Sequence, residues 1–485
     1  LLLRLRRDDS ALFTAYQAAA AEARAAQSAG GDIWRNTSSV QPDAATIRAR
    51  ATAAQKALDD VVARIAARPG YEALFSPLAF ADVAAAVEDA PMAYLATTPA
   101  GSLILLLHKS RTGVAIKTLW ADLTSDELDR LQVRRAVAEG NVGPVEGGLL
   151  WAQIRGTRLG QELADTLPKL GEGLMAPLAA QLREMNATAI TLIPGGELNL
   201  LPLHAATYKV DDAPRAFLDE FTVTFVPSAQ TAAKSRARVQ RGRGAGELED
   251  VKALVVGNPL PLPEGVASLS YAREEAEEVT ALLDAQVAFT GRVMALYETA
   301  ATLGTVTDAL PDQRVLHFAC HGIFDTDEPL NSGLVMVGGE MLTLRAVRDS
   351  TTRVKARLVI LSACQTGITD FHELPDEVIG LPAGFLAAGA AGVIGSLWPV
   401  DDRSTALLMT DFHRRVLAGA SPAEALRAAQ LWLRRVTWGE LDAYYTKFLP
   451  RKSAEDAQVE ATQYDPTEAA YPAPYHWAAF TFSGA

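Results

Sequence analysis

Cysteine is nearly absent from this sequence, since only Cys320 and Cys364 occur among 485 residues. So few cysteines exclude a secreted disulfide framework, and the N-terminus has no charged-then-apolar leader, so we expect a cytoplasmic protein. Basic residues are outnumbered by acidic ones, which gives a net charge of −13. Direct binding of nucleic acid is therefore not expected, because phosphate contacts need clustered Lys and Arg.

Charge is also absent from residues 378–400, a stretch just long enough to cross a membrane. However, Pro382 and Pro399 lie near its two ends, and Gly384, Gly389, Gly392 and Gly395 interrupt it between them. We predict a buried helix over residues 381–388, a turn, and a buried strand over residues 393–398. No membrane association is expected from it.

What the chain does contain is enough apolar sequence, 49% of its residues, to fill two or three cores. Leu58, Val61, Val62 and Ile65 form one helical stripe within an Ala-rich start. Beyond it, strand and helix patterns alternate, which predicts an α/β fold with a mostly parallel sheet. We divide the chain into a helical region 1–75, an α/β region 76–232, an Arg/Gly-rich linker 233–250 and a second α/β region 251–485. Predicted strands cover 92–98, 103–108, 114–119, 189–193, 253–256, 286–290, 315–319, 358–361 and 476–482; predicted helices cover 124–138, 149–167, 174–186, 272–283, 298–310, 402–418 and 421–436.

Five basic residues lie from Lys234 to Arg243, mixed with Gly242 and followed by Gly244, and no acidic residue occurs before Glu247. We interpret this segment as a flexible linker between the α/β regions. A processing site and a basic docking strip are the functional alternatives, since exposed Gly/Arg-rich loops attract proteolytic cleavage.

Two apolar runs, at residues 316–322 and 359–367, each end on a reactive side chain followed by glycine. Open α/β sheets place their chemistry just past the carboxyl ends of such buried strands. A thiol needs a neighbouring base to act as a nucleophile, and histidine titrates near neutral pH. The pattern therefore predicts a His321–Cys364 dyad, and it approaches the caspase arrangement of Gln-Ala-Cys-x-Gly with a histidine about 50 residues upstream.

Cys320 and His317 have other expected roles. Side chains alternate along a strand, so Cys320 faces away from His321 and is expected to pack in the core. His317 shares the face of His321, but no second Cys/His pair completes a tetrahedral metal site, so no metal is expected. The loop at Gly257 lacks both nucleotide-binding glycine patterns, and no cofactor is expected.

Several motifs recur in order over about residues 190–485, and together they resemble the CHAT family, bacterial caspase-like peptidases commonly attached to tetratricopeptide repeats. The family is assigned to the caspase, separase and gingipain clan. The motifs are Ile193-Pro194-Gly195-Gly196-Glu197-Leu198 with Leu201-Pro202-Leu203, His321-Gly322-Ile323-Phe324-Asp325, Asn331-Ser332-Gly333-Leu334, Leu361-Ser362-Ala363-Cys364-Gln365-Thr366-Gly367, Ser396-Leu397-Trp398-Pro399-Val400-Asp401-Asp402 and Tyr475-His476-Trp477-Ala478-Ala479-Phe480.

The resemblance implies a caspase-like three-layer fold in residues 251–485, preceded by a degenerate, pseudo-peptidase half in residues 76–232. It implies His321 as general base and acid and Cys364 as the nucleophile. The N–H groups of Gly322 and Cys364 would form the oxyanion hole. The helical region 1–75 would connect to a repeat array or another sensor.

Substrate preference depends on residues around the dyad. In basic-specific relatives of the clan an acidic residue often lies two before the nucleophile, where this chain has Ser362. We therefore expect a small or apolar P1 residue, while Asp325, Asp401 and Asp402 remain candidates for lining the pocket.

The resemblance implies a cysteine endopeptidase that cuts a specific partner protein after an upstream sensor or binding event, in a bacterial defence or signalling system. CRISPR-linked complexes and gasdermin-type substrates are the contexts known for family members. The alternative is a latent or inactive caspase-like scaffold for protein–protein interaction.

Overall fold

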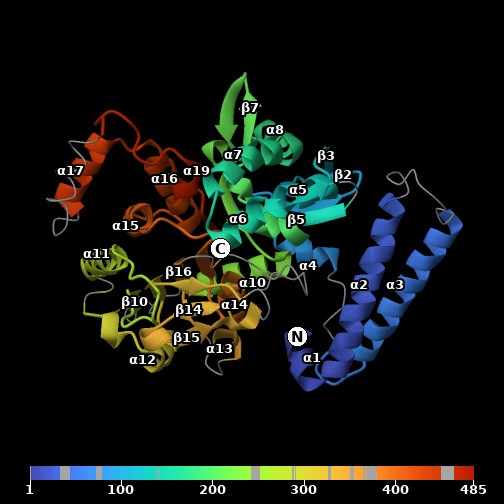
Figure 1. Cartoon of the computed structure of the whole chain (residues 1–485), viewed down its shortest axis with the longest axis horizontal. Coiled ribbons are helices and arrows are strands. Elements are labelled where there is room, and N and C mark those ends of the chain that lie inside the picture. Colours follow the sequence, from blue (N-terminus) through green and yellow to red (C-terminus); the bar gives the residue numbers. More distant parts are fainter. Residues whose placement is uncertain are drawn as a thin grey trace. The chain divides into compact units, whose positions relative to one another are not determined.

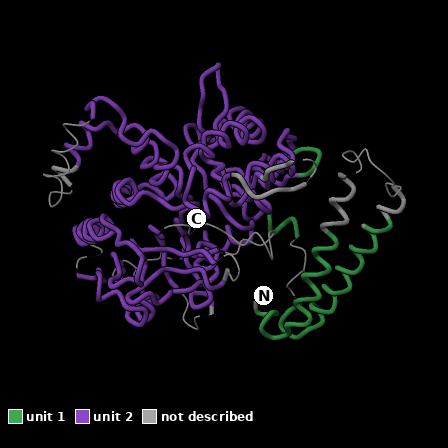
Figure 2. Tube along the Cα trace, in the orientation of Figure 1, with its two compact units in different colours: residues 1–83, 98–101 green, residues 84–97, 102–485 purple. Residues whose placement is uncertain are grey.

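The computed structural model divides into two compact units, green and purple in Figure 2. Unit 1 comprises Leu1–Val83 with Thr98–Gly101, and unit 2 comprises Ala84–Thr97 with Ser102–Ala485. The structure describes residues 2–32, 44–72, 79–138, 141–241, 252–286, 289, 291–325, 329–349, 354–363, 366, 380–448 and 464–485.

Unit 1 is mainly helical, as the Ala-rich start of the sequence predicts. Its long helices are α2 (Ser10–Asp32) and α3 (Ala44–Ala66), preceded by α1 (Leu2–Asp8). Ala54 and Leu58 of α3 pack against Ala23 of α2, and Arg50 forms an ion pair with Glu22 at 2.9 Å. The apolar stripe predicted on α3 thus contacts the neighbouring helix.

Unit 2 contains a large sheet, of which β10, β16, β2 and β3 are labelled in Figure 1. Its described strands follow the order β11-β10-β12-β16-β17-β18-β9-β6-β1-β2-β3. These strands are β1 (Met92–Thr98), β2 (Gly101–Ser110), β3 (Gly113–Ala121), β6 (Ala189–Pro194), β9 (Thr222–Phe225), β10 (Ala253–Gly257), β11 (Val293–Tyr297), β12 (Val315–Ala319), β16 (Leu358–Ser362), β17 (Gly392–Ser396) and β18 (Phe480–Gly484). Smaller sheets join β4 (Arg134–Ala138) to β5 (Asn141–Gly147), β7 (Thr207–Val210) to β8 (Ala213–Ala216), and β13 (Gly322–Ile323) to β14 (Gly333–Val335) and β15 (Met341–Thr343).

The α-helices of this part are α4 (Phe80–Ala85), α5 (Ser125–Gln132), α6 (Leu149–Arg155), α7 (Leu159–Leu170), α8 (Ala176–Glu184), α9 (Phe217–Glu220), α10 (Ala229–Arg241), α11 (Ala272–Asp284), α12 (Leu303–Ala309), α13 (Leu344–Asp349), α14 (Leu381–Ala388), α15 (Asp402–Leu417), α16 (Pro422–Arg435), α17 (Trp438–Phe448) and α19 (Pro474–Trp477). The capping box predicted at Ser421 is present, since its hydroxyl accepts from the N–H of Glu424.

Parallel pairing dominates the large sheet. Strands β11, β10, β12, β16 and β17 pair in parallel, and so do β9, β6 and β1. Every residue of β10, β16 and β17 is buried, which is what continuous apolar runs produce when both faces of a sheet are covered. The predicted α/β fold with a mostly parallel sheet is confirmed.

The last strand of the chain, β18, lies between the strands of the two α/β regions. It pairs antiparallel with β17 and parallel with β9. Strands from residues 76–232 and from residues 251–485 therefore share one sheet within unit 2. The proposed division at residues 75, 232 and 250 stays a prediction.

Helices cover both faces of the sheet at β12. The side chain of His317 contacts Glu275 of α11 and His413 of α15, whereas the ring of its neighbour Phe318 contacts Phe385 of α14. Because adjacent strand residues point to opposite faces, α11 and α15 form one outer layer and α14 belongs to the other. Three layers result, with the sheet in the middle.

The strand predicted over residues 286–290 lies mostly outside the described part of the chain, in which only Gln286 and Phe289 of this range fall. The N–H of Phe289 bonds to the carbonyl of Gln286, and that of Arg292 to Phe289, so these groups close turns instead of joining a ladder. The described strand of this region begins at Val293 and pairs with β10.

Three other predicted boundaries also change. The helix expected to reach residue 138 ends at Gln132, because β-branched Val133 is extended and β4 follows. The helix expected over 149–167 is interrupted at Gly156, whose φ of 66° is left-handed. The closing strand begins at Phe480 instead of residue 476, because Pro474 starts a helical turn.

The expected flexible linker is partly helical. Residues 233–241 continue α10, while residues 242–250 lie outside the described part of the chain. Arg238 donates hydrogen bonds to the carbonyls of Leu386 and Ala390, at 2.7 and 2.8 Å. These carbonyls lie at the end of α14, where helices leave acceptors unpaired, so this arginine acts as a cap.

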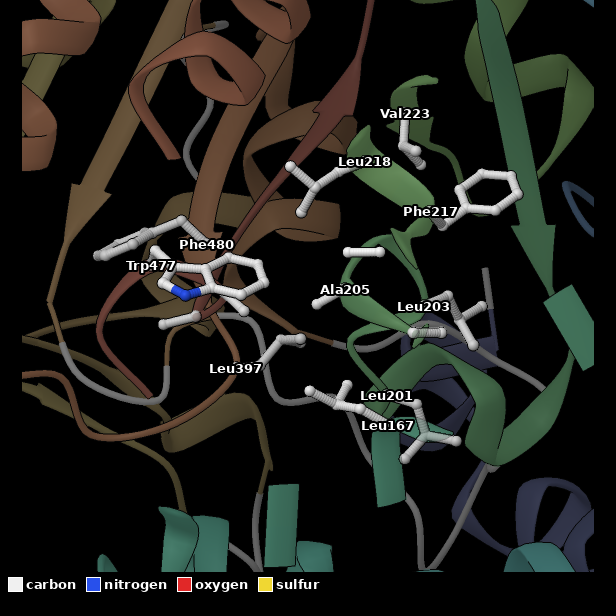
Figure 3. Packing of buried hydrophobic residues seen from close by; sticks show 14 of the residues in the cluster. Leu167, Leu201, Leu203, Ala205, Phe217, Leu218, Val223, Leu397, Trp477 and Phe480 are labelled. Carbon is white, nitrogen blue, oxygen red and sulfur yellow. The ribbon is translucent and has the colours of Figure 1, made fainter. Parts of the chain in front are cut away.

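A single apolar cluster joins residues from both α/β regions (Figure 3). Leu397, Trp477 and Phe480 from the C-terminal part pack in it with Leu203, Ala205 and Leu218 from the first region, as Figure 3 shows. The cluster also contains the fully buried Trp398, whose indole Nε1 donates to the carbonyl of Tyr475 at 3.0 Å. Packing as well as the shared sheet therefore connects the two regions.

Candidate active site

Strands β12 and β16 bring the two reactive segments to the same edge of the sheet. They pair in parallel from Val315 opposite Leu358 to Ala319 opposite Ser362. Partners in this register differ by 43 in sequence number, and the same difference separates His321 from Cys364. Cys364 itself lies outside the described residues, as does Gln365.

The side chain of His321 has a hydrogen bond that fixes its tautomer. Its Nε2 lies 2.9 Å from the carbonyl oxygen of Ala267, which can only accept a hydrogen bond. Nε2 must therefore carry a proton, which leaves Nδ1 of the neutral ring as the basic nitrogen. The imidazole is partly exposed, so Nδ1 is available for proton transfer.

The loop that supplies this carbonyl is fixed at the end of β10. The N–H of Asn258 donates to Ala319 in β12, and its side-chain amide donates to the hydroxyl of Ser268, next to Ala267. Asn258 has a φ of 47°, a left-handed conformation that asparagine tolerates better than most residues. The loop at Gly257, where no nucleotide site was expected, thus positions the partner of His321.

The segment after His321 forms a short hairpin that exposes one backbone donor. The carbonyl of His321 accepts from the N–H of Val335 at 2.9 Å, so the paired residues Gly322 and Leu334 are a non-hydrogen-bonded pair of the β13–β14 ladder. The N–H of Gly322 is consequently not used within this ladder. The buried hydroxyl of Ser332 accepts from the N–H of Asp325 at 3.0 Å, which fixes the far end of the hairpin.

The described residues on either side of Cys364 are buried and hydrogen-bonded to β17. The carbonyl of Ala363 accepts from the hydroxyl of Ser396 at 2.6 Å. The hydroxyl of Thr366 accepts from the N–H of Ser396 at 3.0 Å and lies 3.3 Å from the same carbonyl. Ala363, Thr366 and Ser396 are all nearly inaccessible to solvent.

Beneath the strand ends lies a buried row of titratable groups. His317 Nε2 lies 3.0 Å from Oε1 of Glu275, and His317 Nδ1 lies 3.2 Å from Nε2 of His413. Burial raises the pKa of Glu275 to about 8, although a hydrogen bond from Ser362 opposes the shift. Burial lowers the pKa of His317 to about 3 and holds that of His413 well below its usual value. The row is thus neutral near pH 7. His317 Nδ1 and His413 Nε2 are joined by a hydrogen bond, whereas Oε1 of Glu275 and Nε2 of His317 find no hydrogen-bond partner among the described residues despite their 3.0 Å separation.

The raised pKa of Glu275 gives folding stability a pH dependence, and Glu275→Gln should remove this contribution. A carboxyl with a native pKa near 8 keeps its proton when the unfolded chain, with a pKa near 4.3, has lost it. The stability that this difference in pKa contributes is fully present below pH ~4 and is lost as pH rises towards 8. We expect the free energy of unfolding of Glu275→Gln minus that of wild type to be larger by at least about 1 kcal/mol at pH 8 than at pH 5, because only wild type loses the stability of the protonated carboxyl over this range.

Urea unfolding of both proteins at the two pH values measures this difference. The exposed Glu264→Gln variant is the matched control, and its difference from wild type should be the same at both pH values. If the free energy of unfolding of Glu275→Gln differed from that of wild type by the same amount at pH 5 and at pH 8, Glu275 would be ionised in the native protein.

The candidate pocket residues have structural contacts of their own. Asp401 caps α15, where its Oδ1 accepts from the N–H of Ser404 at 2.8 Å. Asp402 Oδ2 accepts from the N–H of Tyr271 at 2.6 Å, and burial raises its pKa to about 6. Ser362 is buried beside Glu275. The structure thus brings Ser362 and Asp402 to the surroundings of Glu275, whereas Asp325 lies at the end of the β13 hairpin.

Three residues of this region were not singled out from the sequence. Ala267 contributes only its main-chain carbonyl, which no side-chain pattern reveals. Ser396 belongs to a motif that supports the family resemblance, but no chemistry marked it. Glu275 follows Ala272 by three residues and precedes Val279 by four, so its place in the apolar stripe of α11 could have revealed it as a buried carboxyl.

Cys320 is buried, as expected of a packing residue. Across the described ranges, no group of three or more His, Cys, Asp and Glu side chains is arranged to hold a metal ion. None of the helices in those ranges combines the length and the hydropathy needed to cross a membrane.

Two curated proteins are similar in sequence to this chain, and both are named as tetratricopeptide repeat proteins. Human tetratricopeptide repeat protein 28 is 24% identical over 311 residues, covering 53% of this chain and 12% of that protein. The mouse protein of the same name is 24% identical over 350 residues, covering 62% of this chain and 14% of the relative. The chain therefore spans only a small part, about an eighth, of the length of these relatives.

Among solved structures, the Saccharomyces cerevisiae separase–securin complex aligns with a TM-score of 0.38 and 12% identity, covering 96% of this chain and 26% of that chain. The complex of the Porphyromonas gingivalis RgpB pro- and mature domains also aligns with a TM-score of 0.38 and 12% identity. This alignment covers 69% of this chain and 74% of that chain. The family description that matches is the CHAT domain, over residues 164–485. Because this match covers well over half of the 485 residues, the chain belongs to the CHAT domain family.

Proposed function

We propose that the protein is a cysteine endopeptidase in which His321 activates Cys364. The observation that carries this proposal is the 2.9 Å hydrogen bond from His321 Nε2 to the carbonyl of Ala267. This hydrogen bond leaves Nδ1 as the base, on a residue two positions past the end of β12 at Ala319. The equal spacing of 43 residues in the β12–β16 register and between His321 and Cys364 supports the pairing.

The reaction follows from these roles. Nδ1 of His321 takes the proton of the Cys364 thiol, and the sulfur attacks the carbonyl carbon of the scissile bond. The carbonyl electron pair moves to oxygen, whose negative charge is stabilised by the N–H groups of Gly322 and Cys364. The imidazolium then protonates the leaving amine as the C–N bond breaks, and a thioester remains. Water gives a proton to His321 as it attacks the thioester, which releases the acid and restores the thiol.

For the residue before the scissile bond, we propose a small or apolar side chain. Ser362 offers no charge two positions before Cys364. Asp401 is engaged as a helix cap and Asp402 accepts from Tyr271, so neither carboxylate is without a structural partner. Asp325 remains the alternative acidic contributor.

The biological setting belongs to the same proposal. The substrate is a specific partner protein, cleavage follows a signal from an upstream sensor, and the site of action is the cytoplasm. The support is the family resemblance to defence and signalling peptidases, together with a net charge of −13 and only two cysteines. No cofactor is needed by this chemistry, and direct contact with nucleic acid or a membrane is not proposed.

A fluorogenic peptide library with a randomised P1 position tests the activity. We expect cleavage by wild type to fall to background in Cys364→Ala, because the nucleophile is lost. The matched control is Cys320→Ala, which removes the other, buried cysteine and should cleave the same peptides. A dominant Arg or Lys signal would contradict the proposed P1 preference.

The scaffold alternative is tested with the same variants. If wild type and Cys364→Ala both leave the library and the proteins encoded by neighbouring genes uncut, the peptidase proposal fails and an interaction scaffold is the better description.

A further inference from the structure

Three buried groups around the nucleophile segment form a closed ring of hydrogen bonds. The N–H of Ser396 donates to the hydroxyl of Thr366, and that hydroxyl lies 3.3 Å from the carbonyl of Ala363. The hydroxyl of Ser396 donates to the same carbonyl at 2.6 Å. Thr366 Oγ1 also lies 3.5 Å from the carbonyl of Leu361, a second acceptor within its reach.

The ring connects a loop to rigid structure. Ser396 is the last residue of β17 and lies opposite Phe480 in the β17–β18 ladder, so its backbone is fixed by the sheet. Ala363 and Thr366 belong to the segment that leaves β16. Burying a hydroxyl is costly unless it forms a hydrogen bond. Here the hydroxyl of Ser396 donates to Ala363 in the loop, and the hydroxyl of Thr366 accepts from the N–H of Ser396 in β17.

The carbonyl at the centre of this ring is the one that precedes Cys364. A trans peptide unit is planar, with its C=O and the following N–H pointing in opposite directions. We therefore expect a carbonyl held towards Ser396 to set the direction of the N–H that follows it. That N–H belongs to Cys364, the second donor of the proposed oxyanion hole.

We propose that Thr366 and Ser396 are positioning residues that orient the Ala363–Cys364 peptide unit so that the Cys364 N–H faces the developing oxyanion. This inference rests on the proposed peptidase function and adds two residues to it. The positioning role of Thr366 and Ser396 differs from a purely structural role, because it changes how well the transition state is stabilised. Losing the ring should lower kcat and leave substrate binding and the thiol itself nearly unchanged.

Ser396→Ala and Thr366→Val each remove one hydroxyl with little change in volume. With the best peptide from the P1 library, we expect kcat to fall about 10- to 100-fold, because complete loss of one oxyanion-hole donor costs about 10²- to 10³-fold and misalignment costs part of that. KM should change by less than about threefold. The rate of Cys364 alkylation by iodoacetamide, which forms no oxyanion, should stay within about threefold of wild type.

Two further variants show whether the hydroxyl is responsible. Thr366→Ser keeps the hydroxyl and should retain most of the kcat of wild type. Ser235→Ala removes a hydroxyl from α10 that is also fully buried and finds no partner among the described residues, so it should leave kcat unchanged. Thermal unfolding of each protein separates loss of fold from loss of alignment.

The inference is overturned if Ser396→Ala and Thr366→Val fold and keep kcat within about twofold of wild type. A rise in KM alone, or a Thr366→Ser variant as slow as Thr366→Val, also overturns it. If Ser396→Ala does not fold, the Thr366→Val and Thr366→Ser pair decides; if Thr366→Val also unfolds, the ring has a folding role only. A wild type that cleaves no peptide overturns both proposals, whereas active wild type with unaffected variants overturns this one alone.

Discussion

We expect His321→Ala to lower kcat/KM for the best peptide substrate by about 10³-fold or more, because the thiol then has no base and the leaving amine no acid. His321→Gln should be equally inactive. Glutamine retains an N–H donor for the carbonyl of Ala267 but cannot take the thiol proton, so it separates loss of the base from loss of the hydrogen bond. Steady-state cleavage of the peptide by each purified variant measures the effect.

The matched control is His108→Ala, which removes a partly exposed histidine from β2. Its kcat/KM should equal that of wild type. If His321→Gln retained more than about a tenth of the wild-type activity, general-base catalysis by His321 would be refuted. Equal melting temperatures for wild type and His321→Gln are required for this comparison.

We expect Trp398→Ala to have the largest effect on stability, a loss of about 4 kcal/mol in the free energy of unfolding. The indole is completely buried in the cluster that joins the two α/β regions, and its Nε1 donates to the carbonyl of Tyr475. The substitution leaves a large cavity and removes the donor for a partly buried carbonyl. Urea unfolding followed by tryptophan fluorescence and circular dichroism measures the change.

Trp120→Ala is the corresponding control, since this side chain on β3 is 63% exposed. The same chemical change should alter the free energy of unfolding by less than about 1 kcal/mol there. A Trp398→Ala variant as stable as Trp120→Ala would show that the cluster does not depend on the buried indole.

The strands that build the site were predictable because each is apolar on both faces. β12 over 315–319 and β16 starting at Leu358 agree with the prediction, and α14 coincides with the helix predicted in the uncharged stretch. Continuous apolar runs identify strands that are covered on both sides. The reactive residues after β12 and β16 followed from the same reasoning, since parallel strands bring their carboxyl ends to one edge.

Long-range contacts could not be predicted in this way. The arginines near residue 238 resembled a flexible linker, because the carbonyls that Arg238 caps lie about 150 residues further along the chain. The main-chain carbonyl of Ala267 is equally invisible in a sequence, since every residue has one. The hydroxyl ring at Ser396 depends on the register of β17 with its neighbours, which no local pattern determines.

Covalent labelling tests the proposed dyad most directly. A peptidyl acyloxymethyl ketone that carries the preferred P1 residue should form a thioether with the activated nucleophile, and peptide mapping by mass spectrometry locates it. We expect the adduct on Cys364 in wild type, none on Cys320, and strongly reduced labelling in His321→Gln. Equal labelling of Cys364 in wild type and His321→Gln, or an adduct on Cys320 in place of Cys364, would contradict the assignment of His321 and Cys364 as the catalytic pair.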